Sequence, residues 1–143
     1  MPTNIKTSPK NPARRSWQVA HTLQVSFQYA WAGVLYATAT QRNFRVHLGV
    51  GAIAVALGIM LRITPLEFAV VGIMIALVLT MELLNTAVEA MVDLAIGDQY
   101  HDLAKIAKDC AAGAVLISSI GAMFVAGWIL LPPLVHSIAH LFI

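Results

Sequence analysis

Three long apolar runs dominate the pattern of hydrophobic and polar positions along this chain. They cover residues 46–61, 66–81 and 110–131. With a rise of about 1.5 Å per residue, the last run is about 33 Å long as a helix and can cross a hydrocarbon core about 30 Å thick. The two shorter runs need their flanking turns to complete a crossing. The pattern therefore predicts three transmembrane helices, with ends marked by Pro65 and by the pair Pro132 and Pro133.

A different pattern precedes these runs, between Ser16 and Thr40. Apolar residues recur there at steps of three and four, as on one face of a helix: Val19, Leu23, Phe27, Ala30, Trp31, Val34 and Leu35. Glutamines fill much of the remaining surface, and several Trp and Tyr side chains are of the kind favoured at lipid headgroups. We expect an amphipathic helix on the membrane surface. A soluble amphipathic helix is the alternative, but the chain has little left for it to pack against.

The composition agrees with a membrane protein. Of the 143 residues, 59% are hydrophobic and only 11% are charged, against about 25% charged residues in a typical soluble domain. A net charge of +2 gives no reason to expect a nucleic-acid partner, and a single cysteine excludes an intrachain disulfide. We expect an all-α membrane protein with a disordered basic tail (1–15), a membrane domain (16–131) and a short C-terminal tail on the non-cytoplasmic side (132–143).

The basic residues predict how the protein is oriented. If the N-terminus is cytoplasmic, Arg62 is the only one of the nine Lys and Arg residues that lies on the outer side. The other eight are Lys6, Lys10, Arg14, Arg15, Arg42, Arg45, Lys105 and Lys108. Such a bias of basic residues toward the cytoplasm is typical of membrane proteins. We therefore expect a multi-pass protein of the plasma (inner) membrane with its N-terminus and its polar site on the cytoplasmic side.

The second apolar run passes directly into the acidic stretch ELLNTAVEAMVD, residues 82–93. Four polar side chains of this stretch share one helix face: Glu82, Asn85, Glu89 and Asp93. At 100° per residue they fall within about 80° of the circumference and extend about 16 Å along the axis. Such a stripe reaches from the hydrocarbon edge into water, so that one end can meet a lipid alcohol and the other a soluble ligand. Ionisable groups at this depth are costly and are therefore functional candidates.

Basic and acidic groups gather again just beyond this stretch, in the segment DQYHDLAKIAKD. His101, Lys105 and Lys108 share one helical face, and Asp109 follows directly. Carboxylates suit Mg²⁺, which keeps waters and phosphate oxygens among its ligands, and lysines neutralise phosphate charge. The combination therefore favours a nucleotide that is bound together with a divalent metal.

Three other interpretations stay open on these residues alone. In the first, the carboxylates only form ion pairs with basic neighbours, namely Arg42, Arg45, Lys105 and Lys108. In the second, the stripe relays protons or cations in an ion-coupled transport or channel subunit, which leaves the basic cluster unexplained. In the third, the protein is a non-catalytic assembly subunit.

The sequence contains no P-loop, no GxGxxG loop and no recognisable Ser/His/Asp arrangement, and we interpret His136 and His140 as tail residues.

The third apolar run also carries small residues at intervals of four. These residues are Ala114, Ser118, Ala122 and Ala126. Small side chains at this spacing allow helices to approach closely in lipid. Three membrane spans are few for enclosing a site within one chain. We therefore expect a homo-oligomer, although alanine in an apolar helix is also a simple filler.

The stretch ELLNTAVEAMVD, with GDQYHDLAKIAKD after it and YAWAGVLYATATQRNFRVH before it, resembles the prokaryotic diacylglycerol kinase family of small membrane lipid kinases. The resemblance covers residues 16–131. It implies a surface helix and three transmembrane helices per subunit, in a homotrimer with sites between subunits. It also implies that ATP, with Mg²⁺, phosphorylates the hydroxyl of a membrane lipid. The motifs YAxxG and NFRxH are similar to the branch that includes undecaprenol kinases, so diacylglycerol and undecaprenol both stay open as substrates.

The resemblance implies roles for individual residues. Glu82 matches the catalytic base, which takes the proton from the lipid hydroxyl as the hydroxyl attacks the γ-phosphate of ATP. Asn85 would orient Glu82 or that hydroxyl, and Glu89 matches a glutamate that bridges to ATP through Mg²⁺. The other expected nucleotide contacts are Tyr29, Asp93, Gln99, Tyr100, His101, Lys108 and Asp109. The expected lipid contacts are Trp31, Arg45 and Asn85.

One position departs from the family pattern. The family usually has a second metal-binding glutamate eight residues after the glycine of the surface helix, and counted from Gly33 this position is Gln41. Glutamine is neutral and binds a metal ion less strongly than a carboxylate does. Either Gln41 contacts the metal through water, or Glu89 and Asp93 contribute more to metal binding.

Overall fold

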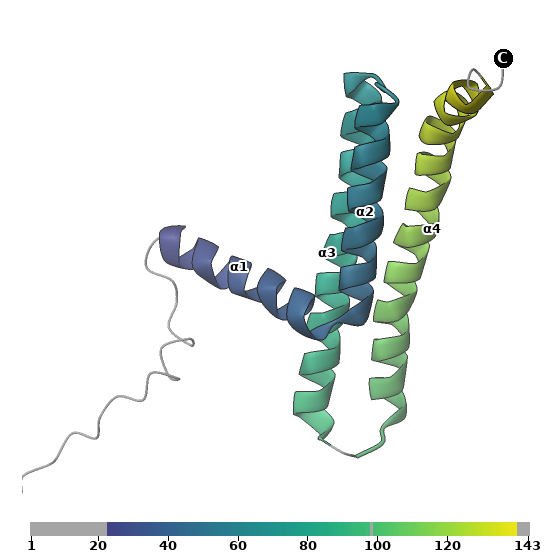
Figure 1. Ribbon diagram of the computed structural model, residues 1–143. Coiled ribbons are helices and arrows are strands. Elements are labelled where there is room, and N and C mark those ends of the chain that lie inside the picture. The colour runs from purple at the N-terminus through teal and green to yellow at the C-terminus, as the bar shows by residue number, and fades with distance from the viewer. Residues whose placement is uncertain (1–22, 98, 140–143) are drawn as a thin grey trace, which may run out of the picture. The chain divides into compact units, whose positions relative to one another are not determined.

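The computed structural model describes residues 23–97 and 99–139. These residues form four helices, with no strand among them: α1 (Leu23–Thr40), α2 (Arg42–Met60), α3 (Pro65–Ile96) and α4 (Asp102–Ala139) (Figure 1). The all-helical class predicted from the sequence is therefore confirmed. The chain divides after Ala32 into two compact units, of which the second begins at Gly33 and contains α2, α3 and α4. Each unit is described by itself.

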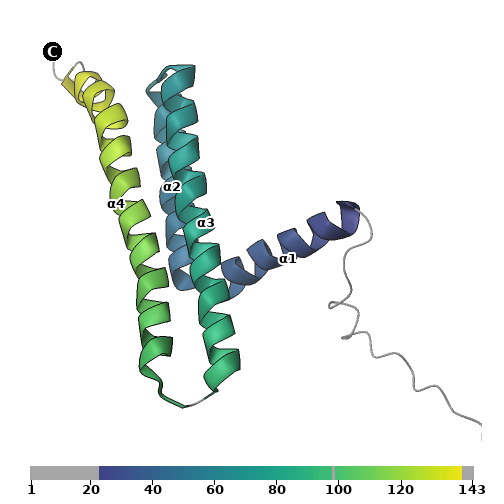
Figure 2. The ribbon, with the colours of Figure 1, turned by 180° about the vertical axis from the view of Figure 1, so that it is seen from behind.

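Helix α3 is the centre of the second unit, because it packs against both α2 and α4, while α2 and α4 touch each other less. The connection from α2 to α3 lies at one end of this bundle, and the connection from α3 to α4 lies at the other (Figures 1 and 2). All three helices are long and apolar enough to cross a membrane, as the three predicted spans require. Most of their large apolar side chains are exposed, as expected of surfaces that face lipid.

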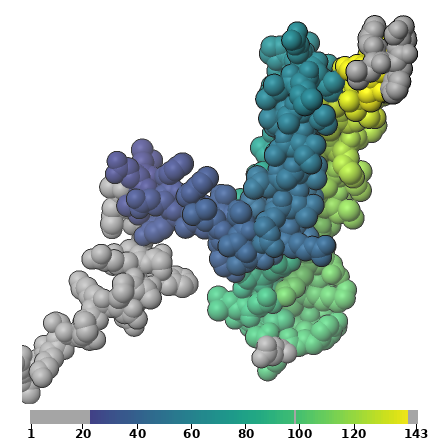
Figure 3. All heavy atoms as spheres, viewed as in Figure 1, coloured from purple at the N-terminus to yellow at the C-terminus, as the bar shows by residue number. Residues whose placement is uncertain are grey.

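The lengths of the three helices place polar groups beyond the apolar core. Helix α2 has 19 residues, whereas α3 has 32 and α4 has 38. At about 1.5 Å per residue these are helices of about 28, 48 and 57 Å, against a hydrocarbon thickness of about 30 Å. Figure 3 shows that α3 and α4 continue past the beginning of α2. Counted from Pro65, Glu82 lies about 26 Å along α3 and Asp93 about 42 Å.

The turn between α2 and α3 is closed by backbone hydrogen bonds of the Schellman type. The N–H of Arg62 donates to the carbonyl of Ile59, and the N–H of Ile63 donates to the carbonyl of Gly58, both at 3.2 Å. Arg62 has a left-handed backbone, with φ of 53°, at the position where glycine is common. A Cβ atom on Gly58 would lie 2.9 Å from Cδ1 of Ile63, so a larger residue at this position would displace the Ile63 side chain.

Helix α3 begins with a complete capping box. The N-cap residue Thr64 precedes Pro65, and its side-chain oxygen accepts a hydrogen bond from the N–H of Glu67. The Glu67 carboxylate accepts in return from the Thr64 N–H at 2.8 Å and from the Thr64 hydroxyl at 2.7 Å. Proline is favoured at the first helical position, so the predicted helix start at Pro65 is confirmed. We call residues 61–67 the capped end.

The opposite end of the bundle, residues 89–109, is the charged end. Helix α3 ends at Gly97, whose N–H donates to the carbonyl of Asp93 at 2.9 Å. Gly97 has φ of 57° and ψ of −132°, a conformation that side chains with a Cβ atom strongly disfavour. The chain then returns into α4 at Asp102. Glycine at this point allows the acidic end of α3 and the basic start of α4 to lie side by side.

One expected boundary was wrong. Pro132 and Pro133 do not end the last helix, because α4 continues through both prolines to Ala139. Proline interrupts helical hydrogen bonding, but transmembrane helices tolerate it where nearby side chains and local adjustments satisfy the freed backbone groups. The helices α2 and α4 begin before their apolar runs, at Arg42 and Asp102, and α2 thereby gains the flanking turn that its short run was expected to need.

The predicted N-terminal elements lie partly outside the described residues. The tail of residues 1–15 and the first part of the expected surface helix are not described, and residues 23–40 form helix α1. The amphipathic, surface-lying character of this helix stays a prediction.

Most of the small residues at intervals of four on α4 lie toward other helices of the same chain. Ser118 is buried, and Ala122 and Ala126 line a groove between α2, α3 and α4. Ala114 is exposed. The small side chains therefore let α4 approach the other helices of the same chain, and the homo-oligomer stays a prediction.

Candidate active site

A polar pocket of about 390 Å³ lies among α2, α3 and α4. Its polar side chains come from all three helices: Asn43 and His47 from α2, Glu82, Asn85 and Glu89 from α3, and Ser119 from α4. Ala112, Val115 and Leu116 of α4 complete the lining. The structure thus brings together three members of the predicted acidic stripe, and it places them beside α2 and α4.

Glu82 is the most deeply buried ionisable residue in the described part of the chain, with 2% of its surface exposed. Its Oε1 atom has no hydrogen-bond partner among the described residues. The Nε2 atom of His47 lies 3.3 Å from this oxygen. Burial of a carboxylate without full hydrogen bonding costs free energy, so a group in this state is a candidate for chemistry.

Asn85 and Glu89 are linked within the pocket. The side-chain amide of Asn85 donates from Nδ2 to Oε1 of Glu89 at 2.9 Å. The side-chain carbonyl oxygen of Asn85, Oδ1, is buried and has no hydrogen-bond partner in the described residues. One turn of α3 therefore presents a fixed carboxylate and a free carbonyl oxygen on the same face as Glu82.

A second, smaller pocket of about 230 Å³ lies at the charged end. It is lined by most of the residues expected to contact the nucleotide, namely Gln99, Tyr100, His101, Lys108 and Asp109, together with Val92, Ile96, Ala104 and Lys105. Lys108 of α4 forms an ion pair with Asp93 of α3, and Lys105 forms one with Asp109. The ion pair between Lys108 and Asp93 ties the two helices together where they leave the apolar region.

The ion-pair interpretation of the acidic stripe holds for only one of its carboxylates. Asp93 pairs with Lys108, as that interpretation predicts. Within residues 23–97 and 99–139, neither Glu82 nor Glu89 forms an ion pair with Lys or Arg. Simple charge pairing therefore leaves the two carboxylates of the polar pocket unexplained.

Besides Asp93, which pairs with Lys108, four predicted site residues lie outside both pockets. Arg45 donates from Nη1 to the carbonyls of Thr38 and Ala39, each at 3.1 Å, where it caps the end of α1. Gln41 donates from Nε2 to the Thr40 hydroxyl at 3.3 Å. The other two, Tyr29 and Trp31, are exposed on the part of α1 that belongs to the first unit. The metal, lipid and nucleotide contacts expected of these four residues stay predictions.

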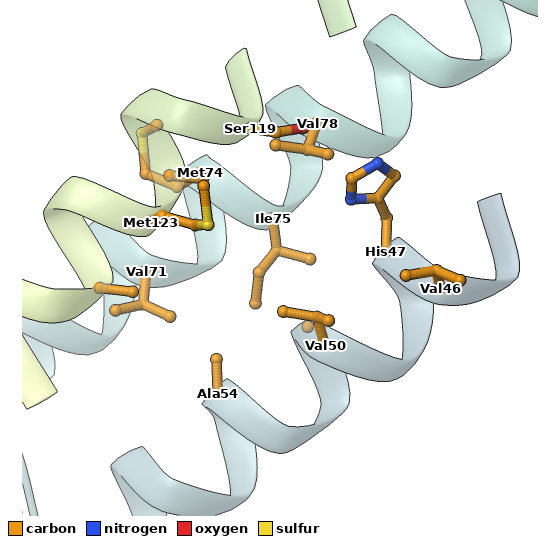
Figure 4. A pocket seen from close by; sticks show the side chains of 13 residues that line it. Val46, His47, Val50, Ala54, Val71, Met74, Ile75, Val78, Ser119 and Met123 are labelled. Carbon is orange, nitrogen blue, oxygen red and sulfur yellow. The ribbon is translucent and has the colours of Figure 1, made fainter. Parts of the chain in front are cut away.

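An apolar groove of about 340 Å³ adjoins the polar pocket (Figure 4). His47 and Ser119 line both spaces, and the rest of the groove is formed by small and branched apolar residues such as Val50, Ala54 and Val71. Figure 4 shows the imidazole of His47 projecting from α2 toward α3, near Val78. A lipid whose polar end enters the pocket thus has apolar surface directly beside it.

Three residues of the polar pocket were missed by the sequence analysis: Asn43, His47 and Ser119. Asn43 and His47 are spaced i, i+4, so they share one face of α2. That spacing was available in the motif NFRVH. It carries little weight alone, because polar residues near the start of a helix often face water.

The oxygen atoms in the polar pocket suit a magnesium ion that is bound partly by the protein and partly by phosphate. No group of three or more His, Cys, Asp or Glu residues in the described ranges could hold a metal ion alone. Mg²⁺ is typically bound through one or two carboxylates, with waters and phosphate oxygens as the remaining ligands. The carboxylate of Glu89 and the free carbonyl oxygen of Asn85 match this pattern.

These features define a three-span helical membrane protein with an acidic site at the edge of its apolar region. The sequence comparisons then identify the family. A family model described as prokaryotic diacylglycerol kinase matches residues 28–130, and the chain belongs to this family of lipid kinases.

Named relatives include both diacylglycerol and undecaprenol kinases. The chain is 54% identical over 130 residues to a diacylglycerol kinase of Synechocystis, covering 90% of this chain and 74% of the relative. It is 37% identical over 109 residues to an undecaprenol kinase of Bacillus subtilis, covering 76% and 88%. It is 35% identical over 95 residues to a diacylglycerol kinase of Escherichia coli, covering 66% and 77%. This chain is therefore a lipid kinase.

Proposed function

We propose that this protein transfers the γ-phosphoryl group of ATP to the primary hydroxyl of diacylglycerol, with Glu82 as the general base. The observation that carries the proposal is the buried Glu82 carboxylate, which has a free oxygen in a polar pocket beside an apolar groove. A lipid alcohol can reach such a carboxylate from the apolar side. The product is phosphatidic acid.

The chemistry asked of the protein is positioning and proton removal. The Glu82 carboxylate takes the hydroxyl proton as the hydroxyl oxygen attacks the γ-phosphorus and the bond to the ADP oxygen breaks. Asn85 holds Glu89 in place through its amide hydrogen bond. Glu89 would hold Mg²⁺, which supplies neutralisation of the charge on the phosphoryl oxygens when bound.

The second pocket supplies the nucleotide contacts in this proposal. Lys108 carries a positive charge that suits phosphate, and Gln99, Tyr100 and His101 lie beside it. The two pockets share no lining residue. We propose that a homotrimer, as the family resemblance implies, completes each site with residues of a neighbouring copy. The proposed orientation, with this end of the bundle in the cytoplasm of the cell, gives the site access to ATP.

Diacylglycerol is the first choice of substrate because the Synechocystis relative, which is 54% identical to this chain over 130 residues, is named a diacylglycerol kinase. Undecaprenol is the second candidate. The undecaprenol kinase of Bacillus subtilis is more similar to this chain than the diacylglycerol kinase of Escherichia coli is, by 37% against 35% identity. Both lipids offer a primary hydroxyl to Glu82.

Transfer of labelled phosphate from ATP to defined lipids tests the proposal. The full chain is reconstituted into vesicles that contain either diacylglycerol or undecaprenol at equal surface fraction. We expect faster transfer to diacylglycerol. Faster transfer to undecaprenol would show that undecaprenol is the preferred substrate. No transfer to either lipid would rule out the proposed reaction. An ion flux measured across the same vesicles without transfer would instead favour the transport alternative.

A further inference from the structure

His47 lies directly against the proposed general base. Its Nε2 atom is 3.3 Å from Oε1 of Glu82, and these two residues face each other from α2 and α3. The side chain of Glu82 is 3% exposed and that of His47 is 25% exposed. His47 is therefore the group next to an otherwise unsatisfied carboxylate oxygen, inside the bundle, and the proposed reaction gives it no role so far.

No hydrogen bond within the described residues fixes the Oε1 atom of the Glu82 carboxylate. In the described residues, Oε1 has no hydrogen-bond partner, and the Thr86 hydroxyl donates to the backbone carbonyl of Glu82 and not to its carboxylate. Asn85 directs its amide to Glu89. A carboxylate that acts as a base has to be held in the productive rotamer by neighbouring groups, because small displacements strongly reduce the rate.

We propose that His47 is the positioning residue for Glu82. The inference rests on the proposed function. With its proton on Nε2, the neutral imidazole donates a hydrogen bond to Oε1 of Glu82 and keeps that proton throughout the reaction. The other carboxylate oxygen, Oε2, then takes the proton from the lipid hydroxyl. Contacts between catalytic groups are often long or poorly aligned before substrate binds and tighten in the reactive complex. The contact of 3.3 Å, which lacks the geometry of a hydrogen bond, requires such an adjustment.

The location of His47 fits this role better than a purely structural one. His47 lines the polar pocket and also the apolar groove, so it lies where the hydroxyl and the tail of a lipid would meet (Figure 4). A histidine that only stabilised the helix pair would gain little there, since α2 and α3 already pack closely where Gly51 lies against the side chain of Ile75.

Three substitutions of His47 separate donation of a hydrogen bond from other roles. His47→Gln retains a side-chain N–H donor that reaches about as far as Nε2, His47→Asn retains a donor that is too short, and His47→Leu retains the bulk without a donor. A hydrogen bond to a charged group contributes enough for its loss to lower kcat by roughly tenfold to a hundredfold. We expect this loss in His47→Leu and His47→Asn, with KM for ATP unchanged, and activity close to wild type in His47→Gln.

His136→Leu is the matched control, because His136 is an exposed histidine near the end of α4 and lies outside both pockets. We expect its kcat to equal that of the wild type. Equal activity of His47→Leu and the wild type would overturn the proposal. Equal loss in His47→Gln and His47→Leu would also overturn it, because the imidazole would then do more than donate. If His47→Leu does not fold, the comparison of His47→Gln with His47→Asn decides in the same way.

The wild-type protein distinguishes this inference from the proposed function. If the wild type transfers no phosphate to either lipid, the proposed function fails. If the wild type is active and the His47 variants do not differ from it, only the positioning role fails.

Discussion

Two carboxylates on helix α3 differ in how far their oxygen atoms are satisfied by hydrogen bonds. Glu67, in the first turn, accepts hydrogen bonds from the N–H and the hydroxyl of Thr64 and closes a capping box. Glu82, farther along the same helix, is buried, and its Oε1 atom has no hydrogen-bond partner in the described residues, although His47 lies 3.3 Å away. The first carboxylate is explained by the local stability of the helix. The second is not, and a cost that the fold leaves uncompensated indicates a group kept for function.

The same contrast extends to the two ends of the bundle. At the capped end, Arg62 and Thr64 form a turn whose backbone groups are satisfied locally. At the charged end, Asp93 and Lys108 form an ion pair that joins two helices beside a pocket. Substitutions at the capped end should therefore change stability, and substitutions toward the charged end should change catalysis. Substitutions at matched positions of the two regions measure this difference.

The largest expected difference separates Glu82→Gln from Glu67→Gln. Loss of a general base lowers kcat by about 10²-fold to 10⁴-fold, so Glu82→Gln should nearly abolish transfer of labelled phosphate to lipid. Glu67→Gln retains an acceptor for the capping box and should leave kcat unchanged. A Glu82→Gln enzyme with half of the wild-type rate would remove Glu82 from the mechanism.

A smaller difference is expected between two basic residues, Lys108 and Arg62. If Lys108 contacts the nucleotide, Lys108→Met should raise KM for ATP by about tenfold, as expected from loss of a hydrogen bond to a charged group. Arg62→Met, at the other end of the bundle, should leave KM unchanged. Steady-state kinetics at varied ATP concentration measures both. Equal KM values in the two variants would show that Lys108 serves only its ion pair with Asp93.

Gln41→Glu tests the missing metal-binding glutamate. A carboxylate binds Mg²⁺ more strongly than an amide does, so the Mg²⁺ concentration for half-maximal activity should fall, by roughly threefold to tenfold. Ser137→Glu adds a carboxylate to an exposed position near the far end of α4 and should leave this concentration unchanged. If both variants resemble the wild type, position 41 is not a direct ligand of the metal.

The smallest effect is expected in the capping box itself. Thr64→Ala removes the N-cap hydroxyl and should lower the free energy of unfolding by about 1 kcal/mol, with no change in kcat. Equilibrium unfolding of the solubilised protein in a denaturing detergent measures the stability. Arg62→Gly should act in the opposite direction, by a few tenths of a kcal/mol up to about 1 kcal/mol, because glycine adopts the left-handed backbone without strain. A loss of activity in Thr64→Ala would contradict the separation of the two regions.

The elements that could be predicted from the sequence are those set by local rules. Three apolar runs, two of them completed by flanking turns, predicted three long helices, and Pro65 marked the start of one of them, as the structure has it. The acidic face of α3 could also be predicted, because the spacing of Glu82, Asn85 and Glu89 fixes their common side. The structure agrees, since all three line one pocket.

Features that depend on other helices could not be predicted. The contact between His47 and Glu82 joins residues far apart in the sequence, and no local pattern specifies it. The separation of the acidic stripe into a buried pair and an ion-paired Asp93 depends on where α4 lies beside α3. The passage of α4 through Pro132 and Pro133 shows the converse, that a local rule for ending helices is overridden in a transmembrane segment.

Helix α3 is unbroken from Pro65 to Ile96, so the position of Glu82 relative to the membrane surfaces depends on the thickness of the bilayer. If the capped end lies at one surface of the bilayer, the rigid helix sets how far Glu82 stands from the opposite surface. A thinner bilayer would leave this carboxylate in water, out of reach of the lipid hydroxyl, and a thicker one would draw it away from ATP. Tilting of the helix absorbs part of such a mismatch. Turnover should therefore be greatest in bilayers of one intermediate acyl-chain length.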